Sequence, residues 1–170
     1  MTRTSYAVAL GSNRRHVRYG APKQVVRAAI EALGEIGTVV QASRIRSVPA
    51  LGPAGRDFAN AAAILETGLG PDALLAALKA LERCFGRRRG RRWGPRVLDL
   101  DIVLWSGGAW RSSSLRVPHP EFRARRFVLQ PLADIAPGWR DPESGLAVRH
   151  LLARLTAPRP EPRDPAGEGP

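Results

Sequence analysis

One short stretch of the chain combines the two kinds of side chain that bind metal-complexed phosphates. Residues 86–102, GRRRGRRWGPRVLDLDI, place an arginine-rich segment directly before Asp99 and Asp101. Arginines attract phosphate oxygens, whereas the two carboxylates would repel a polyanion unless divalent cations lay between them. The stretch therefore predicts a site for a metal-bound polyphosphate.

The spacing of the two aspartates decides where they point. Residues 97–105, VLDLDIVLW, read as a strand, on which alternate side chains lie on opposite faces. Burying the leucines aims Asp99 and Asp101 the same way, and Mg²⁺ relieves the repulsion between two carboxylates on one face. The alternative is that both only pair with the neighbouring Arg92 and Arg96.

The arginine-rich segment also has a simpler interpretation, a solvated basic loop or a nucleic-acid-binding arm. Lys and Arg outnumber Asp and Glu by 27 to 15, for a net charge of +12, so the whole chain should attract anions. Trp93, Gly94 and Pro95 predict a rigid turn that positions Arg92 and Arg96. A mobile loop before that turn could close over a phosphate chain.

The composition predicts one soluble domain. The 170 residues are enough to bury a core, and we expect a single domain over residues 1–157 with a disordered, proline-rich tail over 158–170. Cys84 is the one cysteine, which fits a reducing compartment and excludes an intrachain disulfide. There is no apolar stretch of about 20 residues. We expect a cytoplasmic protein without membrane contact, and a monomer from its size.

Periodicity predicts the elements that must position these residues. Strands are expected at 5–10, 38–48, 58–66 and 97–105, helices at 22–36 and 71–85, and short helices at 125–135 and 148–155. The order β-α-β-β-α-β favours an α+β ferredoxin-like sandwich, in which helices cover one face of an antiparallel sheet, with additional C-terminal helices.

Several motifs, in order along nearly the whole chain to about Leu155, resemble the 6-hydroxymethyl-7,8-dihydropterin pyrophosphokinase family. RWGPRVLDLDI is the most specific of them. The others are GSN at 11–13, LGP at 51–53, FANAA at 58–62, LE at 81–82, VPHPEF at 117–122 and RRFVLQPLADIAP at 125–137.

The resemblance implies an enzyme of folate biosynthesis that moves pyrophosphate from ATP to the hydroxymethyl group of the pterin and releases AMP. It implies an in-line attack at the β-phosphorus, with two Mg²⁺ ions held by Asp99 and Asp101. Four arginines would contact phosphates or cover the site: Arg87, Arg89, Arg92 and Arg96. The other expected nucleotide contacts are Glu82, Trp93, Ile102, His119 and Arg125. The pterin would contact Phe58, Phe127, Asn60 and the backbone around Val48 and Leu51.

Three positions depart from the family pattern: Lys79 replaces a glutamine, Ala50 a proline, and Pro120 an aromatic residue. Two other functions stay open. A ferredoxin-like domain could bind RNA, although its strands would then carry alternating aromatic and basic residues, which this chain lacks. Another ATP-dependent phosphotransferase could share the carboxylate pair, and only Phe58, Asn60 and Phe127 argue against it.

Overall fold

The structure, a computed structural model, describes residues 2–48, 57–86 and 97–158. Its centre is a five-stranded antiparallel sheet in which four strands follow the order β2-β4-β1-β5 and the fifth, β3, also pairs with β4. The strands are β1 (Thr4–Ser12), β2 (Thr38–Ala42), β3 (Arg46–Val48), β4 (Phe58–Thr67) and β5 (Asp99–Trp105).

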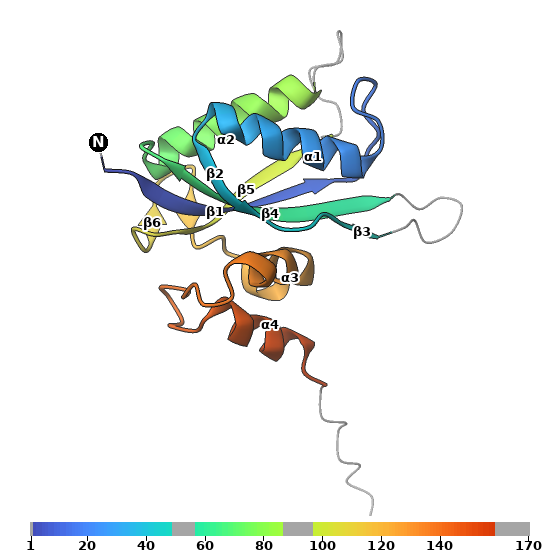
Figure 1. Cartoon of the computed structure of the whole chain (residues 1–170). Coiled ribbons are helices and arrows are strands. Elements are labelled where there is room, and N and C mark those ends of the chain that lie inside the picture. Colours follow the sequence, from blue (N-terminus) through green and yellow to red (C-terminus); the bar gives the residue numbers. More distant parts are fainter. Residues whose placement is uncertain (1, 49–56, 87–96, 159–170) are drawn as a thin grey trace, which may run out of the picture.

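Helices cover both faces of this sheet (Figure 1). Helices α1 (Pro22–Ala32) and α2 (Pro71–Gly86) lie on one face, and α3 (Arg126–Ile135) lies on the other with α4 (Val148–Thr156) packed against it. The remaining elements are two 3₁₀ turns, Leu33–Glu35 and Phe122–Ala124, and a small hairpin of β6 (Trp110–Arg111) and β7 (Arg116–Val117).

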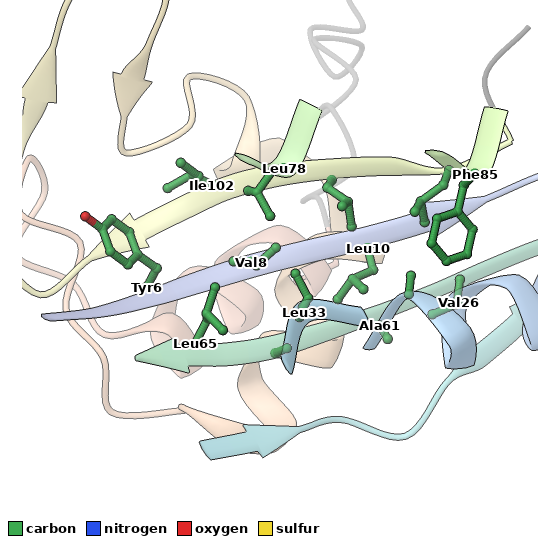
Figure 2. Close-up of a cluster of buried hydrophobic side chains, with 14 of the residues drawn as sticks. Tyr6, Val8, Leu10, Val26, Leu33, Ala61, Leu65, Leu78, Phe85 and Ile102 are labelled. Carbon is green, nitrogen blue, oxygen red and sulfur yellow. The ribbon is translucent and has the colours of Figure 1, made fainter. Parts of the chain in front are cut away.

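The main core lies between the sheet and the first two helices (Figure 2). Pro22 and Pro71 begin these helices, where a missing N–H costs no hydrogen bond. The buried face of α2 includes Leu74, Leu78 and Phe85, and these pack on alternate residues of the strands. This face of the sheet is therefore sealed against ligands.

A second core lies on the opposite face, between β1, β4, β5 and the C-terminal helices. It joins Ala62 and Ile64 of β4 to Phe122, Leu129 and other buried residues. Because β4 is covered on both faces, its sequence is a continuous apolar run instead of an alternating one. The C-terminal helices are thus a full layer of the fold and not an addition at its end.

The predicted antiparallel sheet and mixed α and β composition are confirmed, with local differences. The predicted helix at 22–36 ends as a 3₁₀ turn. The predicted strand at 38–48 is two strands, because Ser43 interrupts it. Its hydroxyl accepts the Ala62 N–H at 2.9 Å while its own N–H donates to the Ala62 carbonyl at 2.8 Å. None of the helices within the described ranges has the length and hydropathy needed to cross a membrane.

Candidate active site

A pocket of about 700 Å³ lies between the sheet and the segment that leads into α3. That volume is typical of sites for small molecules. Strands β1, β4 and β5 supply its floor, and residues 119–128 supply its opposite wall. The lining residues are Ala9, Leu10, Gly11, Ser12, Asn13, Phe58, Asn60, Asp99, Asp101, His119, Arg125, Phe127 and Val128.

The strand register explains why these residues meet. Gly11 of β1 lies opposite Asn60 of β4 on one side and opposite Asp99 of β5 on the other. Two residues earlier on β1, Ala9 lies opposite Asp101. Because Ala9 and Gly11 have small side chains, they leave space over this strand. The Asn60 amide lies on one side of that space, and the carboxylates of Asp99 and Asp101 lie on the other.

Asp99 and Asp101 lie on the pocket face of β5, as the alternation of the strand predicts. The intervening Leu100 and the flanking Leu98 and Ile102 are all at most 2% exposed in the main core. Within the described ranges no group of three or more His, Cys, Asp or Glu side chains could hold a metal ion. Two carboxylates fit Mg²⁺, which commonly takes one or two protein carboxylates and completes its shell with water and phosphate oxygens.

Two side chains of α2 hold the backbone between the aspartates. The Leu100 N–H donates to Oε1 of Glu82 at 2.7 Å, and the Lys79 ammonium donates to the same oxygen at 2.7 Å and to the Leu100 carbonyl at 3.4 Å. Because β5 is an outer strand of the sheet, these bonds satisfy groups that no neighbouring strand pairs. Glu82 is buried there and Ile102 is in the core, and neither lines the pocket. Their expected contacts with a nucleotide stay predictions.

His119 and Arg125 face the carboxylates from the opposite wall. The His119 N–H donates to the Val103 carbonyl at 3.0 Å, and Nδ1 of the ring accepts the Glu121 N–H at 3.2 Å. Burial is the main cause of a lowered pKa for His119; Asp101 opposes it and Arg125 reinforces it. The neutral ring therefore carries its proton on Nε2 and can donate a hydrogen bond.

Two large aromatic side chains are exposed at the pocket. Phe58 is 47% exposed and Phe127 is 53% exposed, although both residues lie in well-packed elements. The guanidinium of Arg125 lies 5.8 Å from the centre of the Phe127 ring. Exposed aromatic faces beside an amide suit a flat, polar-edged ring.

Gly11 limits the space for the Asn60 amide. A Cβ added at Gly11 would lie 3.2 Å from Oδ1 of Asn60, closer than ordinary contact. We predict that Gly11→Ala leaves folding intact or stabilises it by about 0.5–1 kcal/mol. The displaced amide should raise the KM for a ligand bound by Asn60 by about tenfold, since small misplacements of a positioning group are costly.

The control for this prediction is Gly34→Ala, because a Cβ at Gly34 meets nothing within 4 Å. Thermal unfolding and steady-state kinetics on both variants separate the two effects. An unchanged KM in Gly11→Ala would show that the amide does not need its present position.

The structure brings together seven of the predicted site residues: Asp99, Asp101, His119, Arg125, Phe58, Asn60 and Phe127. Val48 ends β3 opposite Phe58. Arg87, Arg89, Arg92, Trp93, Arg96 and Leu51 lie outside the described residues. Ala9, Leu10 and Val128 also line the pocket and were not predicted to do so, and Gly11, Ser12 and Asn13 belong to a predicted motif to which no role was assigned. The residues of β1 reach the pocket because this strand lies between β4, which carries Asn60, and β5, which carries Asp99. This arrangement of the strands is not visible in the sequence.

Fold and pocket define an α+β protein with a cavity that is lined by a carboxylate pair, a histidine, an arginine and two exposed aromatic rings. The model of the 7,8-dihydro-6-hydroxymethylpterin-pyrophosphokinase (HPPK) family matches residues 7–137. The chain therefore belongs to this family.

Relatives agree with that assignment, and a solved structure agrees with the fold. Proteins named 2-amino-4-hydroxy-6-hydroxymethyldihydropteridine pyrophosphokinase are 42% identical in Pseudomonas aeruginosa, over 88% of this chain and 89% of the relative, and 42% identical in Synechocystis, over 62% and 54%. The chain thus spans about half of the Synechocystis relative. A Plasmodium falciparum HPPK-DHPS crystal structure with pteroate shares the fold, with a TM-score of 0.66 at 12% identity, covering 90% of this chain and 42% of the other.

Proposed function

We propose that this protein transfers pyrophosphate from ATP to the hydroxymethyl group of 6-hydroxymethyl-7,8-dihydropterin and releases AMP, as a step in folate biosynthesis. The observation that carries the proposal is the joining of a carboxylate pair, an amide and two exposed aromatic rings in one pocket. The family and the names of the relatives support the same activity.

Asp99 and Asp101 would hold two Mg²⁺ ions at the phosphate end of the pocket. Bound there, the ions would neutralise charge on the phosphate oxygens. The backbone bonds from Glu82 and Lys79 to Leu100 keep the two carboxylates on the same face. The aspartates therefore need little reorganisation when the ligand binds.

On the opposite wall, His119 and Arg125 would donate to phosphate oxygens, the first from Nε2 and the second from its guanidinium. Arg87, Arg89, Arg92 and Arg96 would add positive charge, as the family resemblance implies. These groups favour the charge that develops when the leaving group departs.

The pterin would lie between the rings of Phe58 and Phe127, with Asn60 at its edge. A side-chain amide offers a donor and an acceptor together, which matches the edge of a pterin. The hydroxymethyl oxygen then bonds to the β-phosphorus, the bond to the α,β-bridging oxygen breaks in line, AMP leaves and the hydroxyl proton passes to water. Positioning and electrostatics carry the rate, without a covalent intermediate.

Three further parts of the proposal concern the protein as a whole. We describe the sheet as ferredoxin-like, which the order β2-β4-β1-β5 supports. We also propose a monomer and a cytoplasmic location. A single exposed cysteine agrees with a reducing compartment.

The decisive experiment measures AMP formation from ATP and Mg²⁺ with and without 6-hydroxymethyl-7,8-dihydropterin. AMP that forms only with the pterin is the expected result, and it identifies the transferred group and the acceptor together. ADP formation would instead indicate another phosphotransferase, and no turnover with salt-sensitive RNA binding would indicate a nucleic-acid binder.

A further inference from the structure

Two pocket residues of the proposed phosphate end, His119 and Arg125, flank a very short element. Between them lies the 3₁₀ turn Phe122–Ala124, which has no side-chain cap. The Phe122 ring is fully buried in the second core, and this fixes the first residue of the turn. A turn of three residues has little stability of its own, so the positions of its flanks depend on outside contacts.

One such contact is an ion pair on the side chain of Arg123, which does not line the pocket. Its Nε donates to Oδ2 of Asp141 at 2.7 Å, and an Nη donates to Oδ1 at 2.7 Å. The same Nη also reaches Glu143 at 3.0 Å. Two parallel bonds to a carboxylate fix the guanidinium in direction as well as in distance.

Asp141 is itself held rigidly. It is 0% exposed, and its carboxylate also accepts the Ser144 hydroxyl and the Glu143 N–H. Its backbone closes a tight loop through hydrogen bonds with Leu146 and Gly145, and Gly145 has a φ of 71° that favours glycine. Burial opposes the charge of Asp141, but the hydrogen bonds, that of Arg123 foremost, outweigh it and hold its pKa below the usual value. The acceptor is therefore a fixed, ionised group.

We propose that Arg123 and Asp141 are positioning residues, whose partly buried ion pair sets the places of His119 and Arg125 at the phosphate end of the pocket. The inference rests on the proposed function, since it gives these two pocket residues their ligand. It adds that the loop before α4 determines how tightly the nucleotide is bound. The pterin end depends much less on the pair, because Phe58 and Asn60 belong to β4 and Phe127 belongs to α3, which the second core holds against the sheet.

The Asp141→Asn variant tests this inference, because a change of charge and a loss of positioning would alter nucleotide binding in opposite directions. Losing a negative charge near the pocket should strengthen the binding of an anion, if charge alone mattered. Losing the position of His119 and Arg125 should weaken it. We expect the Kd for α,β-methylene-ATP with Mg²⁺ to rise by about tenfold or more, while the Kd for the pterin changes by less than about twofold.

Arg123→Lys is the gentler second variant. It keeps the charge and loses only the two-bond geometry, so we expect a smaller rise in the nucleotide Kd than in Asp141→Asn. Hydrogen exchange should become faster across residues 119–126 in both variants, at a temperature where both remain folded. The matched control is Arg116→Ala, which removes an exposed partner of Glu143 from the same cluster and should leave both Kd values within about twofold.

Unchanged or tighter nucleotide binding in Asp141→Asn would overturn the inference, and so would equal weakening of nucleotide and pterin, which general loosening would produce. The wild-type chain tests the proposed function separately from the positioning role. If the wild-type chain neither binds the nucleotide analogue nor releases AMP, both ideas fall. If the wild type is active and Asp141→Asn binds the analogue equally well, only the positioning role is wrong.

Discussion

Asp99→Ala and Asp101→Ala are each expected to abolish measurable turnover, with kcat lower by about a thousandfold or more. Metal ions supply several kcal/mol of charge stabilisation to phosphoryl-type transfers, and each 1.4 kcal/mol is about tenfold in rate. Asp99 is exposed and Asp101 is half-buried, both on the pocket face. Removing one of two neighbouring like charges should not lower the free energy of unfolding.

The measurement is AMP release over a range of Mg²⁺ concentrations, together with thermal unfolding. The control is Glu31→Ala, an exposed carboxylate of α1 on the face of the sheet away from the pocket. It should match the wild type in both assays. Near-normal turnover of either aspartate variant, in folded protein, would contradict the assignment of the metal ligands.

The strand of Asp99 and Asp101 was predictable from the sequence because its pattern has a period of two. Once the leucines are assigned to the core, the aspartates can only face the other way. Helix starts were equally clear, since Pro22 and Pro71 are each followed by an apolar stripe at helical spacing. Such local patterns are enough to predict a strand or the start of a helix, because they depend only on neighbouring residues of the chain.

Other features depended on distant partners. The break of the strand at 38–48 follows from a side chain that takes the place of a backbone group, since the Ser43 hydroxyl bonds to β4. The sequence predicted short helices at 125–135 and 148–155, but not that they cover the second face of the sheet. The small residues of β1 and β4 read as weak strand formers, although Ala9 and Gly11 leave the space of the pocket.

The composition of the pocket also depends on residues that are distant in the sequence. Phe58 and Phe127 belong to different elements, and from the sequence alone each would be assigned to the core. Only the family resemblance predicted a shared ligand for them. Their exposure in one pocket is the physical observation that agrees with it, because a core phenylalanine would not leave about half of its surface in water.

Phe58→Ala and Phe127→Ala are expected to weaken pterin binding strongly and to affect stability little. Stacking of a nucleic-acid base on an aromatic side chain is worth about 1–3 kcal/mol, and a pterin ring is of similar size. Each change should raise the pterin Kd by roughly 5- to 150-fold. The loss of stability should be small, since both rings are about half exposed before the ligand binds.

Pterin fluorescence titration gives the Kd, and α,β-methylene-ATP binding tests whether the nucleotide end is intact. Phe58→Ala should change only the pterin Kd. Phe127→Ala should also weaken nucleotide binding slightly, because the Phe127 ring lies beneath the guanidinium of Arg125. Val40→Ala, which truncates a side chain of β2 that is 54% exposed, is the control for losing an exposed apolar group. A pterin Kd that stays at the wild-type value in both phenylalanine variants would rule out stacking between the two rings and place the heterocycle elsewhere in the pocket.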